Sequence, residues 1–265
     1  MDPFQASEYA SITVSIAVLA FAAWCDLKTR EVPDEVWLVY GPVGAALMIY
    51  RLWVEPSLLI LTAASIGLSI LLAFGLVLFG LTGGADGKAL ICLGLALPLP
   101  PQTLTPILGY FHPFLPIVVL YTAYLASISV AFWMVGKNLT LWAQYKSGMF
   151  QGLEHEPAWK KVLAFITGFR AQLSELRSVF YLYPMEKVVD DDGGARRTFE
   201  MYSNPDVDRD QLVSEFEESL KKVGSPSIVW VTPGIPLLVF VLIALVIVLL
   251  LGDPLFFAIR ILMRH

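Results

Sequence analysis

Long runs without any charged residue dominate this sequence, and they constrain its fold more than any other feature. One of them extends from Ala89 to Gly136 without a single Asp, Glu, Lys or Arg. Across the chain, 57% of the residues are hydrophobic and only 15% are charged, whereas soluble domains carry about 25% charged residues. A helix that crosses a bilayer needs about 20 mostly apolar residues. The pattern therefore predicts a polytopic membrane protein.

Several of these uncharged segments are long enough, or nearly so, to be transmembrane helices. The longest run must hold two of them, because the prolines from Pro98 to Pro116 remove backbone donors and clash with the preceding turn. The expected spans are Tyr9–Cys25, Val36–Tyr50, Ser57–Leu81, 89–108, 114–136 and Ile235–Leu251. The fold class predicted is an all-α polytopic membrane protein with about six transmembrane helices.

Most of the charged residues lie in one part of the chain, between Lys137 and Lys222. This distribution predicts a membrane domain with about five spans at 1–136 and a hydrophilic insert at 137–232. A C-terminal transmembrane helix is expected within 233–265.

The insert has the pattern of a small α+β module. Apolar residues recur at helical spacing over 159–173, and this helix is expected either to lie on the membrane surface or to pack on the rest of the insert. Strand-like segments on both sides of 190–194 predict a β-hairpin. A further helix is expected over 208–223, with Asp208 capping its start and Gly224 its end.

Positive charges indicate which side of the membrane the loops occupy. Lys28 and Arg30 follow the first expected span, and Lys88 follows the third. Because Lys and Arg are enriched in cytoplasmic loops, we expect these loops and the insert on the cytoplasmic side and the N-terminus outside. The predicted location is the cell membrane, with several passes through it.

Two aspartates, Asp26 and Asp86, differ from the other acidic residues in their positions. Asp26 closes the first expected span and Asp86 closes the third, so both are expected at the same cytoplasmic face. Acidic residues close to membrane spans often have a function. An interfacial charge beside Lys28 and Arg30 is the alternative explanation of Asp26.

A pair of neighbouring carboxylates can hydrolyse a peptide bond with water. One carboxylate must be ionised to accept a proton from water, and the other must be protonated to donate to the scissile carbonyl. Close carboxylates share one proton, because their repulsion separates the two titrations. We therefore predict that Asp26 and Asp86 form an aspartyl peptidase dyad, in which the sequence does not assign the acid and the base.

Small residues precede Asp86. Gly83 and Gly84 are expected to permit unusual backbone angles and the close approach of an extended substrate, with Ala85 completing the segment. An ordinary glycine-rich helix end is the simpler explanation of this string, which gains its significance from the pairing with Asp26.

Other charged residues near the two aspartates are candidates for substrate contact. Glu31, Asp34 and Glu35 can attract a basic segment of a substrate, although helix capping also accounts for Asp34. Lys88 can bias the charge of the dyad, although marking the cytoplasmic boundary is the favoured explanation.

Other reaction chemistries fit this sequence poorly. His155-Glu156 is followed by Trp159 where a zinc-binding helix motif requires histidine, and the two cysteines cannot make a four-cysteine zinc site. No Ser or Cys nucleophile pairs with a convincing His base, and no phosphate-binding loop occurs. No basic patch interleaves with aromatic residues as nucleic acid would require. We expect no metal, no cofactor and no nucleic-acid partner.

Two segments of the chain resemble the motifs of a known family. Asp26–Asp34 (DLKTREVPD) resembles the first catalytic segment of type IV prepilin peptidases, and Gly83–Leu90 (GGADGKAL) resembles their second, the GxGD motif. The similarity covers most of the chain. The insert and Trp230–Gly234, before the last span, resemble the archaeal branch of preflagellin peptidases.

This resemblance implies a substrate class and a site. It assigns the catalytic roles to Asp26 and Asp86, and it implies cleavage of membrane-inserted preflagellin or prepilin-like precursors on the cytoplasmic side. The sequence departs from the family at Ala85, which replaces the second glycine of GxGD. The tetracysteine segment of many bacterial members is also absent, so their linked N-methyltransferase activity is not expected.

Three alternatives remain open. A presenilin-type or signal-peptide-peptidase-type protease shares GxGD, but it places both acids deeper in the membrane. A proton-coupled transporter would use Asp26 or Asp86 as a relay without proteolysis. A non-catalytic assembly protein of a surface filament would tolerate the loss of both acids.

Overall fold

The computed structural model describes residues 2–191, 194–200, 209–224 and 226–263. The chain forms two compact units. The first joins Met1–Ser127 to Pro236–His265, and the second comprises Ile128–Ile235.

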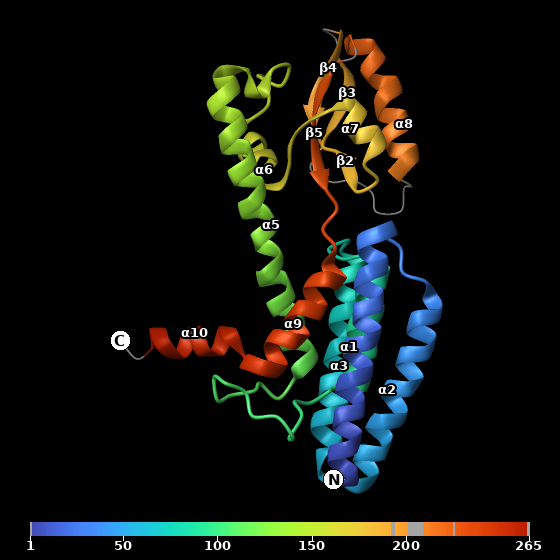
Figure 1. The fold of residues 1–265 in the computed structure, drawn as a ribbon. Coiled ribbons are helices and arrows are strands. Elements are labelled where there is room, and N and C mark those ends of the chain that lie inside the picture. Colours follow the sequence, from blue (N-terminus) through green and yellow to red (C-terminus); the bar gives the residue numbers. More distant parts are fainter. Residues whose placement is uncertain (1, 192–193, 201–208, 225, 264–265) are drawn as a thin grey trace. The chain divides into compact units, whose positions relative to one another are not determined.

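The first unit is a bundle of helices (Figure 1). Its elements are α1 (Pro3–Thr29), α2 (Asp34–Val54), the short 3-10 helix η1 (Pro56–Leu58), α3 (Leu59–Leu78), α4 (Gly84–Ala96), the first part of α5 (Leu115–Tyr145), α9 (Leu237–Leu251) and α10 (Pro254–Leu262). Helix α4 packs against both α2 and α3, and α1 packs against α2 and α9. The buried core lies among α1, α2, α4, α5 and α9.

Four helical segments in the described part of the chain are long and apolar enough to cross a membrane. They are α1, α2, η1 with α3, and α5 over Leu115–Ala143. Helices α9 and α10 pass the same test only as a pair and meet at 57°, which gives up to five spans. Gly252, with a φ of 95°, ends α9, and the Asp253 side chain caps α10 by accepting a hydrogen bond from the Phe256 N–H.

The expected span over 89–108 is wrong. Helix α4 ends at Ala96, and no helix forms again before Leu115. The prolines in this stretch prevent an uninterrupted helix, and the Pro98 carbonyl instead accepts a hydrogen bond from Ser65 Oγ at 2.6 Å. The chain therefore has four or five candidate spans rather than about six.

Small residues bring the helices of the first unit close together. A Cβ atom at Gly44 of α2 would lie 2.8 Å from the Cβ of Ala96 in α4, and one at Gly94 would lie 2.9 Å from the Cβ of Ser69 in α3. Such contacts are common between membrane helices, where small side chains let backbones approach.

The second unit combines the end of α5 with a small sheet, a hairpin and short helices. A three-stranded antiparallel sheet has the order β1–β5–β2, and β3 pairs antiparallel with β4. The strands are β1 (Phe169–Gln172), β2 (Leu182–Pro184), β3 (Glu186–Asp191), β4 (Gly194–Phe199) and β5 (Ile228–Pro233). The helices are η2 (Lys146–Phe150), α6 (Ala158–Thr167), α7 (Leu173–Ser178), α8 (Arg209–Leu220) and η3 (Lys221–Val223).

A buried ion pair connects the hairpin to the sheet. Glu186 of β3 accepts hydrogen bonds from Nε and Nη2 of Arg197 at 2.6 and 2.8 Å. The same carboxylate accepts a hydrogen bond from the Trp230 N–H of β5 at 2.6 Å. The Trp230 ring stacks on Phe150 with a centroid distance of 5.1 Å, so aromatic packing and the ion pair reinforce each other.

The α+β content predicted for the insert is confirmed, with one change of element. The hairpin forms as β3 and β4, and Gly224, with a φ of 84°, ends the helix expected over 208–223. The expected helix over 159–173 is wrong beyond Thr167, because the chain there enters β1 and pairs with β5. Asp208, the predicted cap, lies outside the described residues.

Candidate functional site

Asp26 lies in the last turn of α1 and is largely buried. Its carboxylate lies 3.6 Å from Nη1 of Arg30, one helical turn later. It also accepts a hydrogen bond from the backbone N–H of Leu238, in the first turn of α9, at 3.3 Å. A cation and the positive end of a helix therefore both stabilise a negative charge at this position.

Asp86 lies in the first turn of α4, which is not among the helices that can span the membrane. The expectation that Asp86 closes the third span is wrong, because α3 ends at Leu78 and a new helix begins at Gly84. Its carboxylate accepts a hydrogen bond from the Gly83 N–H at 3.1 Å, an arrangement that caps the helix. Burial raises the pKa of Asp86 to about 6, the Gly83 N–H opposes this rise, and the negative charge of Asp26 adds to it. The two aspartates predicted from the sequence therefore lie within electrostatic range of each other.

The segment before Asp86 differs from the prediction in its backbone. Gly83 has a φ of −72° and a ψ of 161°, which any residue adopts, and Gly84 and Ala85 already belong to α4. The expectation of unusual backbone angles is wrong, because the helix begins two residues before Asp86. Ala85 therefore fits without strain. A Cβ atom at Gly83 would lie 3.4 Å from Asp86 Oδ2, an ordinary van der Waals contact, so a small side chain would also fit there.

The remaining candidate residues lie on exposed parts of the same segments. Lys88 Nζ and Asp34 Oδ1 form an ion pair at 2.6 Å that connects α4 to the start of α2. Residues two apart on a helix do not face each other, so Lys88 points away from Asp86. Glu31 and Glu35 are exposed. Pro33 occupies the cap position of α2, so the predicted capping role of Asp34 is wrong.

Comparison with known proteins gives two matches to family models. The model of the type IV leader peptidase family matches residues 13–135, a range that contains Asp26 and Asp86. The model of the archaeal peptidase A24 C-terminus, type II, matches residues 160–254. Along most of its length the chain is therefore similar to the type IV leader peptidase family and its archaeal A24 C-terminal part.

Three preflagellin peptidases are similar to this chain over nearly their whole length. The preflagellin peptidase of Methanocaldococcus jannaschii is 25% identical over 241 residues, which cover 89% of this chain and 91% of the relative. The preflagellin peptidase of Methanococcus voltae is 23% identical, with 91% and 94% covered. That of Methanococcus maripaludis is 22% identical, with 89% and 92% covered. The resemblance inferred from the motifs is thus confirmed.

The sequence analysis missed several groups that lie near Asp26 and Asp86. The Leu238 N–H belongs to the last long helix, and no local pattern connects it to Asp26. Thr82 Oγ1 has no hydrogen-bond partner, although it is buried and lines, together with Asp86, a cavity of about 10 Å³. The hydroxyl of Tyr124 is likewise buried without a partner and lies within range of the charge of Asp86. A cavity of this size can hold one water molecule, which needs about 10–15 Å³.

Proposed function

We propose that this protein is a membrane aspartyl endopeptidase that removes signal peptides from preflagellin-like or prepilin-like precursors. One observation carries the proposal: Asp26 at the end of α1 accepts a hydrogen bond from the Leu238 N–H, and Asp86 at the start of α4 lines a cavity with the adjacent Leu237, so both aspartates lie at the start of α9. The matches to peptidase family models and the full-length similarity to preflagellin peptidases support it.

The different surroundings of the two carboxylates suggest their roles. Asp26 has a cation and a backbone donor that stabilise its charged form, so it is the base that accepts a proton from water. Asp86 is half-buried and has no cation beside it in the described contacts, so it holds the shared proton and donates it to the scissile carbonyl oxygen. The resulting diol intermediate collapses when a proton returns to the leaving nitrogen and the C–N bond breaks.

The substrate is proposed to reach this pair from the cytoplasmic face. Lys28 and Arg30 lie at the end of α1 and Lys88 lies near the start of α4, so positive charges flank the dyad as expected at the cytoplasmic side. Gly83 and Gly84 are exposed, so an extended peptide can approach the backbone before Asp86.

The exposed acidic residues provide the charge that selects a substrate segment. Glu31, Asp34 and Glu35 attract the basic part of a signal peptide, and Lys88 reduces the charge of this group by pairing with Asp34. The bilayer holds the hydrophobic helix of the precursor beside the enzyme.

A cleavage assay tests this function directly. Purified protein in detergent is mixed with a preflagellin or prepilin that carries its signal segment, and the new N-terminus of the product is sequenced. Asp26→Asn and Asp86→Asn are compared with wild type and with Glu55→Gln, an exposed carboxylate next to η1, while thermal melting reports folding.

The outcomes distinguish the candidate functions. Cleavage by wild type and Glu55→Gln, lost in both folded aspartate variants, supports the dyad. Cleavage that survives either aspartate substitution removes that residue from the mechanism. If wild type cuts neither precursor, the substrate assignment fails and the transporter and assembly alternatives return.

A further inference from the structure

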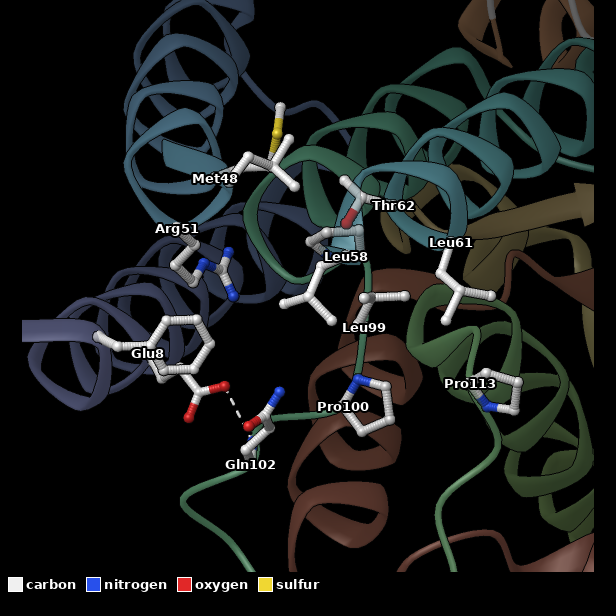
Figure 2. A pocket seen from close by; sticks show the side chains of 13 residues that line it. Glu8, Met48, Arg51, Leu58, Leu61, Thr62, Leu99, Pro100, Gln102 and Pro113 are labelled. Carbon is white, nitrogen blue, oxygen red and sulfur yellow. Dashed lines mark hydrogen bonds between the residues drawn. The ribbon is translucent and has the colours of Figure 1, made fainter. Parts of the chain in front are cut away.

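A second site lies at the other end of α1, the helix that carries Asp26. A cavity of about 230 Å³ opens between the start of α1, the end of α2, the start of α3 and the loop after α4 (Figure 2). Glu8 of α1 lines it, and the 18 residues from Glu8 to Asp26 correspond to about 27 Å of helix. The cavity is therefore separate from the aspartate pair.

Two buried charges face this cavity. Glu8 is 2% exposed, and its two carboxylate oxygens accept hydrogen bonds from the backbone N–H groups of Gln102 and Thr103 at 2.9 and 3.0 Å. Arg51 is 7% exposed, and its Nη2 donates to the Ala96 carbonyl. Figure 2 shows the guanidinium turned toward Glu8 and Gln102.

The cation of this site has no ionic partner. Arg51 makes no ion pair with Glu8 among the described contacts, and its Nε has no hydrogen-bond partner. A buried cation without a paired anion is costly, so the cavity is expected to hold an oxygen that faces the guanidinium.

The remaining walls indicate the kind of molecule that supplies this oxygen. Leu52, Leu58, Leu61 and Leu99 make much of the lining apolar. A single water needs only about 10–15 Å³, far less than this cavity offers. The apolar chain of an amphiphile would contact the apolar walls, and its polar head would face the Arg51 guanidinium.

We propose that the cavity binds one zwitterionic membrane lipid, with a phosphate or ester oxygen facing the Arg51 guanidinium and an ammonium group facing Glu8. A site that contains one buried cation and one buried anion favours a head of zero net charge. The start of α1, the end of α2 and the start of α3 are ends of candidate spans, where lipid headgroups lie. The inference rests on the membrane location and not on the peptidase reaction.

Native mass spectrometry and thermal melting of the full chain in detergent test this proposal. The probes are a phosphatidylethanolamine, a phosphatidylglycerol and inorganic phosphate. We expect the phosphatidylethanolamine to remain bound as one adduct and to raise Tm by about 5 °C at saturating concentration. The phosphatidylglycerol should bind more weakly, and phosphate should cause no shift. The proposal would be overturned if both lipids bound equally and neither remained as a discrete adduct. A rise in Tm with inorganic phosphate alone would also overturn it.

Two substitutions locate the adduct. Leu99→Trp fills the cavity without touching either charge, and it should remove the adduct while cleavage persists. Leu71→Trp, at a position of α3 that is 68% exposed, is the matched control and should keep it. Arg51→Lys keeps the charge but lacks Nε, and it should lower affinity about tenfold. An adduct that survives Leu99→Trp in the folded protein places the lipid elsewhere.

A separate observation concerns α6 in the second unit. One face of α6 is buried through Ala164, whereas its opposite face exposes Trp159, Val162 and Ile166, which are 61%, 58% and 39% exposed. Asn138 of α5 donates hydrogen bonds to the carbonyls of Phe165 and Gly168 at 2.8 and 2.6 Å. Asn138 belongs to the candidate span Leu115–Ala143, so the end of α6 lies level with the last turns of that span.

We infer that α6 lies in the headgroup region of the bilayer, with its exposed apolar face toward the acyl chains. The continuity with the α5 span fixes its depth, and Trp is a side chain favoured at this boundary. In this placement α6 packs on the rest of the insert through Ala164 and meets the bilayer with its opposite face, so both positions considered for the helix apply.

Spin labels in liposomes of phosphatidylglycerol and phosphatidylcholine test the position of α6. Val162→Cys and Ile166→Cys are labelled and compared with Glu218→Cys on the exposed surface of α8, with the unsubstituted protein as background. Collisions with oxygen should be frequent and those with a water-soluble nickel chelate about tenfold rarer at 162 and 166 than at 218. Nickel access equal to that at 218 would mean that α6 faces water. Low access to both reagents would mean that protein covers it.

Discussion

The backbone N–H of Leu238 donates a hydrogen bond to the Asp26 carboxylate at 3.3 Å across 212 residues of sequence. The contact makes the start of α9 a part of the aspartate site, although α9 contributes no charged side chain to it. Because α1 and α9 pack along each other, the position of Asp26 depends on the segment that returns from the second unit. Arg30 adds the second contact of the same carboxylate.

Removal of the Arg30 charge should slow cleavage without unfolding the protein. Arg30 has a φ of 60°, a left-handed conformation that glycine adopts freely, so Arg30→Gly preserves the end of α1. The lost cation lies 3.6 Å from Asp26, and a charge pair at this distance contributes about 1–4 kcal/mol. We expect kcat/KM to fall at least about tenfold. Lys28→Ala, which removes a cation placed over Trp24, should leave the rate within about twofold, and an equal loss in both variants would argue against a local effect.

Cleavage should decline as the pH rises above about 6. Burial raises the pKa of Asp86 to about 6, so its proton is present below that pH and is lost above it. An acid that must donate a proton then becomes inactive on the alkaline side, and the apparent value belongs to the pair. The measurement is kcat/KM against pH in one detergent. A rate that stays flat up to about pH 8 would contradict the assignment of the proton to Asp86.

Substitution of Gly44 should destabilise the first unit. A Cβ atom there would lie 2.8 Å from the Cβ of Ala96 and 3.0 Å from its backbone N, and overpacking of this kind costs about 1–3 kcal/mol. Gly67→Ala is the matched control in α3, because no atom lies within 4 Å of the added methyl group. Unfolding in detergent, followed by circular dichroism, should separate Gly44→Ala from Gly67→Ala, which gains helix propensity. Equal melting temperatures would mean that α2 and α4 can move apart at no cost.

Loss of the Glu186 carboxylate should unfold the second unit more easily. Glu186→Ala leaves the Arg197 guanidinium and the Trp230 N–H buried without their acceptor, which costs about 3–5 kcal/mol. Lys187→Ala breaks an exposed ion pair with Glu200 on the same hairpin and should cost less than about 1 kcal/mol. Denaturant titrations followed by near-UV circular dichroism compare the two variants. A cost below about 1 kcal/mol for Glu186→Ala would show that the hairpin is not held by this contact.

Much of the membrane part could be predicted from the sequence because burial in lipid imposes a local pattern. The uncharged runs located α1, α2, α3 and α5, and the motifs that singled out Asp26 and Asp86 lie within the range matched by the family model. The prediction failed where a local rule was incomplete. Over 89–108 the apolar character was correct, but prolines ended the helix at Ala96. In the insert, helical spacing continued into β1, where pairing with β5 overrides the local preference.

The sequence by itself determined where most apolar helices form, that Asp26 lies at the end of the first of them and which family the chain resembles. The place of Asp86, at the start of α4 and not at the end of α3, came only from the structure. Only the tertiary structure decided which groups surround those aspartates: the Leu238 N–H for Asp26, and the neighbouring charge of Asp26 for Asp86. It also decided that Arg51 and Glu8 share a cavity far from the pair. Helices follow from contacts within a few residues of the chain, whereas hydrogen bonds between distant segments depend on how whole helices pack.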